Sequence, residues 1–201
     1  MAIYVVRHGE TELNAARIIQ MMTTPLSERG RRQATLVATR LAPLGIARIL
    51  TSDLARAVET ATAIADATQA PMLIDPLLRE RDFGDIRGTP YNELGRDPFA
   101  PDYHPPNGES WAMFHDRVAA AWELVGRVAL ETPGNLVVVT HGLVCRVLAD
   151  RHLALADGTA APSLWGNTAL TEVDAAPPWS VRTLACIAHL DGDEPPPGAV
   201  A

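Results

Sequence analysis

Arginine, histidine and glutamate residues follow separate apolar segments of this chain, and together they could transfer a phosphoryl group. Arg7 and His8 end the first apolar run, Arg56 and Glu80 follow two later runs, and His141 follows a fourth. A neutral imidazole is a competent nucleophile, and guanidinium groups hold phosphate oxygens in a bidentate manner. A carboxylic acid can protonate a departing alkoxide. We therefore expect a phosphate-handling histidine at position 8.

The order of apolar segments predicts where these side chains meet. Strand-like runs occur at about 2–6, 47–51, 71–75, 135–140, 168–173 and 181–187, with helical patterns between most of them. This alternation predicts an α/β fold, a three-layer α/β/α sandwich with a mostly parallel six-stranded sheet. Since ligands bind beyond the carboxyl ends of parallel strands, we expect the four polar junctions to converge at one sheet edge.

Capping residues and apolar periodicity place the helices. Ser27 is a plausible N-cap for a helix that stops at Gly45, and Asp53 could cap the next one. A third helix is expected after Ser110 and a fourth after Gly142. Their apolar stripes have the spacing of core-facing helix surfaces.

Composition limits the classes of ligand and compartment. The chain has 201 residues and a net charge of −7, which argues mildly against nucleic acid as a partner. All 17 cationic residues are arginine, so any phosphate must be held by guanidinium groups, histidines or backbone N–H groups. No apolar run is long enough to span a membrane, and no signal-peptide pattern is evident. We expect a cytoplasmic protein with no membrane partner.

Two segments differ from the rest. Residues 82–110 contain five prolines and scattered glycines, and we expect an irregular cover over the site. Residues 1–190 are expected to form a single domain, and residues 191–201 a disordered tail. Cys145 and Cys186 lie in apolar runs and are expected to be core thiols in a reducing compartment.

Sequence motifs in a fixed order sharpen this interpretation. The motifs lie at residues 7–11, 25–30, 52–61, 78–88, 107–110 and 140–142, and include Arg-His-Gly-Glu-Thr, Pro-Leu-Ser-Glu-Arg-Gly and Thr-His-Gly. In this order the chain resembles the histidine phosphatase superfamily, branch 1, also called phosphoglycerate mutase-like proteins. The resemblance runs from about residue 3 to residue 173.

The resemblance implies a role for each residue that matches a motif. His8 would be the nucleophile that becomes phosphohistidine, and Glu80 the general acid. The catalytic set would include two arginines and a second histidine, namely Arg7, Arg56 and His141. The phosphate would be bound by Arg7, Asn14, Arg56, His141 and the backbone at Gly142. Neither a metal nor an organic cofactor is implied.

Plainer roles stand beside these. His8 and His141 could be structural histidines, Arg56 and Glu80 could be surface charges, and Asn14 could shape a turn. A metal site at His8, His141 and Glu80 has no short ligand spacing to support it. Candidates for the substrate end are Leu13, Met21, Met22, Tyr91, Trp165 and Asn167. Met21 and Met22 could equally be core residues, and Glu109 and Ser110 could touch substrate or only start a helix.

The charge of the cover bears on the reaction. Residues 82–115 contain only Arg87 and Arg96 as cations, against six acidic residues at 82, 85, 93, 97, 102 and 109. Such a cover is poorly suited to clamp a second phosphate, so we expect a phosphatase acting on a small-molecule phosphate ester. The alternatives are a 2,3-bisphosphoglycerate-dependent phosphoglycerate mutase, a protein-phosphohistidine phosphatase and a non-enzymatic binding module. The oligomeric state is open, a homodimer being one option.

Overall fold

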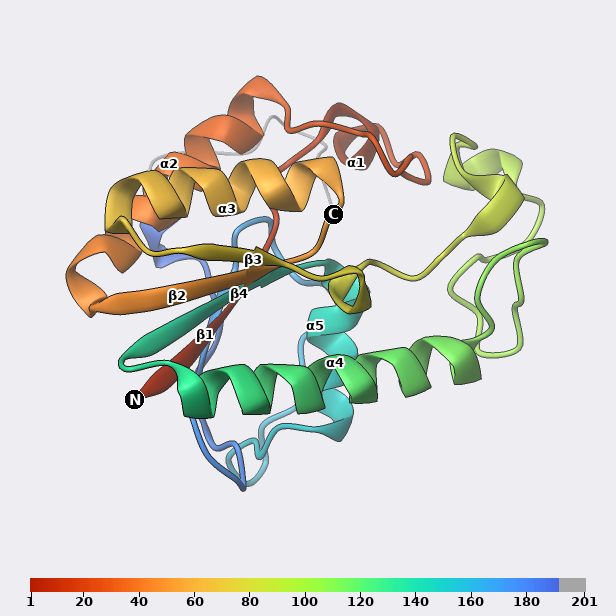
Figure 1. Ribbon diagram of the computed structural model, residues 1–201. Coiled ribbons are helices and arrows are strands. Elements are labelled where there is room, and N and C mark those ends of the chain that lie inside the picture. The colour runs from red at the N-terminus through yellow and green to blue at the C-terminus, as the bar shows by residue number, and fades with distance from the viewer. Residues whose placement is uncertain (192–201) are drawn as a thin grey trace.

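A six-stranded sheet in the order β3-β2-β4-β1-β5-β6 separates two layers of helices in the computed structural model, which describes residues 1–191 (Figure 1). The strands are β1 (Ala2–Arg7), β2 (Ile46–Thr51), β3 (Met72–Ile74), β4 (Asn135–Thr140), β5 (Leu170–Asp174) and β6 (Val181–Cys186). β1, β2, β3 and β4 are parallel, whereas β5 is antiparallel to both of its neighbours, β1 and β6. The predicted mostly parallel sheet is confirmed.

Helices cover both faces of the sheet, which confirms the predicted three-layer sandwich. The helices are α1 (Glu12–Ala15), α2 (Glu28–Leu41), α3 (Ala55–Thr68), α4 (Trp111–Glu131) and α5 (Gly142–Arg151). α2 and α3 lie on one face, and α4 and α5 lie on the other (Figure 1). No helix within residues 1–191 is long and apolar enough to cross a membrane.

The alternation of side chains along β1 explains the two cores. Ile3 and Val5 pack with α4 and α5, while Tyr4 and Val6 pack with α2 and α3. Successive side chains of a strand point to opposite faces, so a run that is apolar throughout serves both layers. This is why the central strands lack the polar–apolar alternation of a half-exposed sheet.

Of the two predicted helix caps, Ser27 is confirmed and Asp53 is wrong, and the helix expected after Ser110 is capped by that serine. Ser27 caps α2 by accepting the Gly30 N–H, and Ser110 caps α4 by accepting the Met113 N–H. Asp53 does not cap α3, whose N-cap residue, Leu54, makes no side-chain bond. The Asp53 carboxylate is instead paired with the Arg79 guanidinium through two hydrogen bonds. A bidentate, charge-assisted pair outcompetes a single bond to a backbone N–H.

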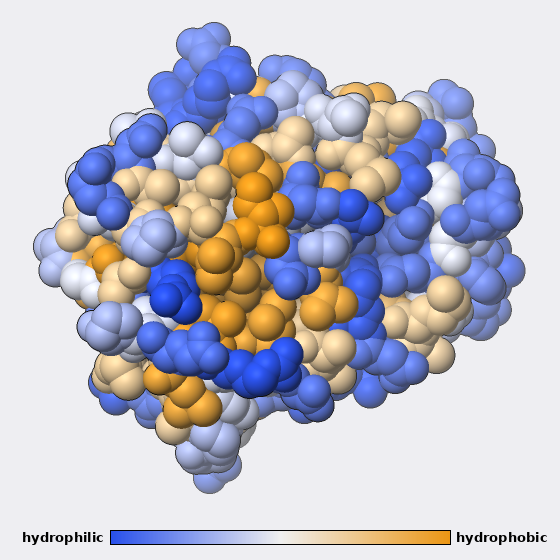
Figure 2. All heavy atoms as spheres, in the orientation of Figure 1, coloured by the Kyte–Doolittle hydropathy of each residue, from blue (hydrophilic) through white to orange (hydrophobic). Residues whose placement is uncertain are grey.

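The two edges of the sheet are less well covered than its centre. On β3, Leu73 and Ile74 are exposed, and Figure 2 shows apolar side chains gathered on this face. Cys145 is buried in α5 as expected, but Cys186 is only partly buried on the edge strand β6. The prediction of a core thiol is therefore wrong for Cys186, because no further strand within residues 1–191 covers that edge.

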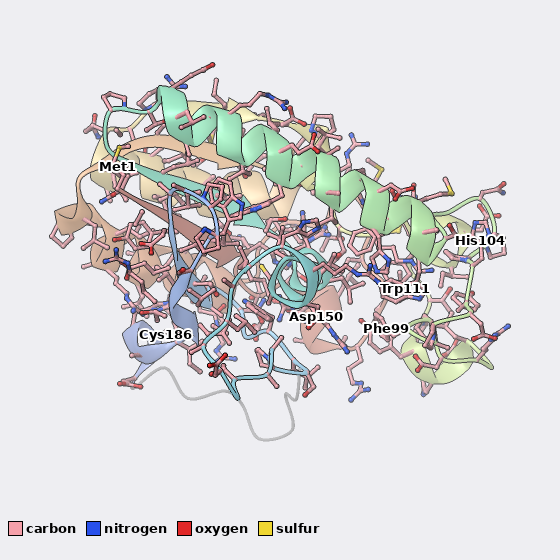
Figure 3. All side chains as sticks on the ribbon, turned by 90° about the horizontal axis from the view of Figure 1, so that it is seen from below. Met1, Phe99, His104, Trp111, Asp150 and Cys186 are labelled. Atoms are coloured by element: carbon pink, nitrogen blue, oxygen red, sulfur yellow. The ribbon has the colours of Figure 1, made fainter. Side chains whose placement is uncertain are left out.

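Residues 82–110 hold only short 3₁₀ turns, including Gly84–Ile86 and Tyr91–Glu93. The segment projects beyond the sheet near the start of α4, where Phe99, His104 and Trp111 lie at the same end of the molecule (Figure 3). The segment is therefore irregular, and its role as a cover stays a prediction. The expected tail beyond Asp191 lies outside the described residues.

Candidate active site

The two predicted histidines lie side by side at the carboxyl ends of β1 and β4. Parallel pairing places Arg7 opposite Thr140, and the His8 N–H then donates to the Thr140 carbonyl at 2.9 Å. The ring centroids of His8 and His141 are 5.1 Å apart. Both side chains are buried, at 1 % and 0 % exposure. Buried polar rings at the end of a sheet need specific partners, and each ring has one.

The partners of the His8 ring show which of its two nitrogens carries a proton and which carries the lone pair. Nδ1 lies 2.7 Å from the Gly9 carbonyl, which can only accept a hydrogen bond, so Nδ1 carries the proton. Nε2 then presents its lone pair and accepts from Arg56 Nε at 3.3 Å. Burial, with Arg56 and Arg7 nearby, holds the pKa of His8 well below its ordinary value of 6.5. The imidazole is therefore neutral, as a nucleophile must be.

The backbone around His8 is fixed by close packing. The His8 carbonyl accepts from Asn167 Nδ2 at 3.2 Å and from the Thr168 N–H at 3.3 Å. A Cβ atom at Gly9 would lie 2.5 Å from the Gly30 carbonyl oxygen, and one at Gly30 would lie 2.0 Å from that of Glu10. The loop after β1 and the start of α2 thus approach so closely that only glycine fits.

Two buried arginines face the cavity with donors to spare. Arg7 and Arg56 are 8 % and 2 % exposed, and within residues 1–191 neither forms an ion pair with a carboxylate. Arg7 donates to the Trp165 carbonyl and Arg56 to the Met21 carbonyl, while Arg7 Nε has no partner from residues 1 to 191. Burying guanidinium charges without a carboxylate is costly, so this arrangement fits an anionic ligand.

The second histidine and the start of α5 add further polar groups to this end of the sheet. His141 Nε2 bonds with Ser52 Oγ at 2.9 Å, and its Nδ1 has no partner in the described part of the chain. Burial and the nearby Arg56 lower the pKa of His141 well below its ordinary value. Gly142 begins the ten-residue helix α5, whose first N–H groups lie at the site. Helix N-termini favour anions.

Glu80 lies at the same site, held through its carboxylate. Its Oε1 accepts from the Arg81 N–H at 2.9 Å, and its Oε2 accepts from the Leu143 N–H at 3.1 Å. Burial raises the pKa of Glu80 above 4.5, although these two N–H groups and the nearby Arg56 and Arg7 oppose the rise. A carboxyl group with a raised pKa beside a nucleophile suits proton donation.

The predicted residues share one cavity of about 560 Å³. It is lined by Arg7, His8, Asn14, Arg56, Glu80 and Gly142, while His141 lies directly beside His8. Among the candidates for the substrate end, Met21, Met22, Tyr91 and Trp165 line the cavity, whereas Leu13 and Asn167 do not. Met21 and Met22 are 45 % and 38 % exposed, so the alternative that they are core residues is wrong.

Asn14 has the character of a binding group as well as of a turn residue. Its N–H donates to Thr11 Oγ1 in the first turn of α1, which explains the local turn. Its Oδ1 is buried and has no hydrogen-bond partner among the described residues. The amide therefore retains hydrogen-bonding capacity toward the cavity.

Sequence reasoning missed two residues that support the site. Ser52 orients the His141 ring, and its only signal was its place in the motif at 52–61. Arg117 lines the cavity and bonds to the backbone that leads to Glu80. Arg117 belongs neither to the sequence motifs nor to the apolar stripe of α4, so nothing in the sequence signals this contact.

The sequence that forms this site matches the model of a known protein family over most of the chain. The model of the histidine phosphatase superfamily (branch 1) matches residues 3–181, which include every residue of the site described above. The chain belongs to the histidine phosphatase superfamily.

The proteins to which this histidine phosphatase is similar include one named as a mutase and one named as a phosphatase. A probable phosphoglycerate mutase GpmB from Serratia proteamaculans (strain 568) is 35 % identical over 207 residues, with 95 % of each chain covered. The structure of Bacillus stearothermophilus YhfR aligns with a TM-score of 0.80 at 27 % identity, covering 94 % of this chain and 98 % of that one. A mycobacterial glucosyl-3-phosphoglycerate phosphatase, solved with VO3, aligns with a TM-score of 0.73 at 26 % identity, covering 86 % and 90 %.

Proposed function

We propose that this protein is a phosphatase that hydrolyses small-molecule phosphate monoesters through a phosphohistidine at His8. The observation that carries the proposal is the set of groups around His8 Nε2. A neutral imidazole, two buried guanidinium groups with unused donors and a carboxyl group of raised pKa line one cavity. These are the groups that in-line phosphoryl transfer requires.

In the first step, the lone pair of His8 Nε2 attacks phosphorus and the bond from phosphorus to the leaving oxygen breaks. The proton on Glu80 passes to that oxygen, so the alcohol leaves neutral and Glu80 becomes a carboxylate. Arg7 and Arg56 hold the non-bridging oxygens. The Gly9 carbonyl, at 2.7 Å from Nδ1, stabilises the positive charge that develops on the imidazole ring.

In the second step, water attacks the phosphohistidine. The Glu80 carboxylate accepts a proton from the water as the new bond to phosphorus forms, and the bond between phosphorus and Nε2 breaks. Inorganic phosphate leaves, His8 is again neutral and Glu80 is again protonated. The cycle consumes one water and needs no other reactant.

The pH dependence follows from the two shifted groups. His8 must be neutral, and its lowered pKa places the acid limb of kcat/KM well below pH 6.5. Glu80 must be protonated for the first step, and its raised pKa places the alkaline limb above pH 4.5. We expect a bell-shaped profile for phenyl phosphate, measured at constant ionic strength. A profile that keeps rising across the neutral range would contradict the role of Glu80.

Hydrolysis is favoured over isomerisation because the two arginines of the cover are already paired with carboxylates. Arg87 is paired with Asp82 at 2.5 Å, and Arg96 is paired with Asp102 at 2.5 Å and does not line the cavity. Arg87 lines the cavity, but its charge is already paired with Asp82, and Arg96 lies outside the cavity, so the cover presents little unpaired positive charge to a second phosphate or a carboxylate. A mutase must retain a doubly charged intermediate against water, and this cover offers little charge for that purpose.

One observation favours a mutase as the second candidate. Arg17 lines the cavity, its guanidinium carbon lies 5.7 Å from the centre of the Tyr91 ring, and it has no carboxylate partner within the described part of the chain. An arginine in this position could hold a second anionic group of a phosphoglycerate.

A pair of assays separates the two functions. We expect phosphate release from p-nitrophenyl phosphate and from a panel of sugar phosphates, phosphoglycerates and nucleotides. We expect that release to survive EDTA and to fall with vanadate. A coupled assay should detect no 2-phosphoglycerate from 3-phosphoglycerate primed with 2,3-bisphosphoglycerate. Isomerisation faster than phosphate release would make the protein a mutase, and dephosphorylation confined to a phosphohistidine peptide would favour a protein phosphatase.

A further inference from the structure

The Arg117 guanidinium on α4 donates hydrogen bonds to the backbone of the segment that ends in Glu80. Its Nη1 donates to the Leu77 and Arg79 carbonyls, each at 2.8 Å, and its Nη2 donates to the Glu80 carbonyl at 3.1 Å. Its Nε and Nη2 also donate to the two carboxylate oxygens of Glu109, each at 2.7 Å. The two side chains are only 18 % and 15 % exposed.

Arg117 and Glu109 both line the cavity, but their bonding leaves little for a substrate. The bonds to carbonyls and to the carboxylate use all the N–H donors that a guanidinium offers. The carboxylate of Glu109 is also occupied, because Oε2 accepts from the Asp82 N–H at 2.9 Å as well. This pair therefore differs from Arg7 and Arg56, which keep donors free.

Glu109 and Arg117 together hold residues 77–82 through hydrogen bonds, and we call this pair of side chains the bracket. Its own N–H donates to the Asp82 carbonyl at 2.8 Å, so residue 82 is held through both its N–H and its carbonyl. Arg117 holds the carbonyls just before and at Glu80. Past the end of β3 at Ile74, no sheet neighbour fixes the backbone here within residues 1–191. Hydrogen bonds from the side chains of Arg117 and Glu109 hold this segment in place of strand pairing.

The position of the Glu80 carboxyl group depends on this bracket. The carboxylate meets the Leu143 N–H at 3.1 Å and must also reach the leaving oxygen of a phosphate on His8. A displacement of about 1 Å of a reacting group can cost about 100-fold in rate. The backbone of residue 80 must therefore be held to a fraction of that distance.

We propose that Arg117 and Glu109 are positioning residues for the proton-donating carboxyl group of Glu80, a role that rests on the proposed function. They contact neither the phosphate nor the leaving group. Their removal should slow the step that needs proton donation and should spare phosphate binding. Phosphorylation of His8 by an ester that leaves without a proton should be affected much less.

The test compares phenyl phosphate with p-nitrophenyl phosphate, which have similar shapes but leaving groups of different basicity. For Arg117→Lys we expect the rate of His8 phosphorylation, measured by rapid quench, to fall by about 100-fold with phenyl phosphate and by less than about fivefold with p-nitrophenyl phosphate. KM should stay within about twofold for both esters, since phosphate binding is not touched. The alkaline limb of the phenyl phosphate profile should shift, which a general loss of structure would not cause.

A second variant and a control keep the test decisive. Glu109→Gln, which keeps the side-chain size, should show the same selective loss, and the double variant should lose little more than either single variant. Arg127→Lys, at an exposed position of the same helix, should leave both rates unchanged. Thermal unfolding identifies any variant that is not folded at the assay temperature, and Glu109→Gln then carries the test.

Two outcomes would overturn the proposal. Equal losses of the phosphorylation rate with the two esters would mean that the pair only supports the fold, and a raised KM with an unchanged phosphorylation rate would mean that it binds substrate. Failure of the proposed function is separately visible, because wild-type protein quenched during turnover of p-nitrophenyl phosphate would then carry no phosphate on His8.

Discussion

Replacing His8 by alanine should lower kcat for p-nitrophenyl phosphate by at least about 10⁴-fold, because no covalent intermediate can form without the imidazole. The residual rate would come from the arginines, which still bind and polarise the ester. The wild-type protein, quenched in alkali during turnover, should carry a base-stable, acid-labile phosphoryl group on His8, and the variant should carry none. Mass spectrometry of the quenched peptides measures this directly.

The variant is expected to fold, since His8 contributes a neutral ring whose removal leaves space next to a cavity that is already open to ligand. His152→Ala, which removes a histidine at the end of α5 and away from the cavity, serves as the matched control. Retention of more than about a tenth of the wild-type rate in His8→Ala would show that another group attacks phosphorus.

The fold could be predicted because its sequence signals are local. Apolar runs that serve two helical layers, such as Ile3–Val6, predict buried parallel strands, and serine caps mark helix starts. The signal fails where a competing partner comes from far along the chain. Asp53 lies one residue before the N-cap position of α3, and its carboxylate bonds with Arg79, a partner that comes from the segment after β3. Cys186 likewise lies on an edge strand, a fact that only the strand order reveals.

The candidate site divides in the same way. His8, Arg56, Glu80 and His141 could be named from motifs, and parallel strands explain why residues so far apart in sequence meet. Their protonation states could be anticipated only in part. Arg7 and Arg56 explain only part of the lowered pKa of His8, because burial is the larger cause. Burial also raises the pKa of Glu80.

The supporting residues were beyond the sequence because their partners are backbone atoms. Arg117 bonds to carbonyls 37 to 40 positions earlier in the chain, and every residue type presents the same carbonyl. No pattern of side chains can signal such a contact. The same holds for the Trp165 carbonyl, which accepts a hydrogen bond from the Arg7 guanidinium. A site is therefore easier to recognise than the scaffold that holds it in place.

Replacing Glu80 by glutamine should lower kcat for phenyl phosphate by about 10²- to 10⁴-fold, the usual contribution of general acid catalysis. Glutamine keeps the size of the side chain but has no carboxyl proton to give. With p-nitrophenyl phosphate, whose leaving group needs little protonation, we expect phosphorylation of His8 to slow by less than about tenfold. Rapid-quench measurement of the phosphoenzyme isolates this step from the later attack of water.

The pH profile supplies the second arm of this prediction. With a glutamine at position 80, the alkaline limb that the raised pKa of Glu80 produces should disappear, while the acid limb set by His8 should remain. Glu93→Gln, an exposed acid of the cover, should leave both limbs in place. The glutamine amide can still accept from the Arg81 N–H but opposes the Leu143 N–H with a donor, so a thermal unfolding measurement must show a folded protein. If the two esters lose rate equally and the alkaline limb persists, another group donates the proton, and the bracket formed by Arg117 and Glu109 loses its catalytic meaning with it.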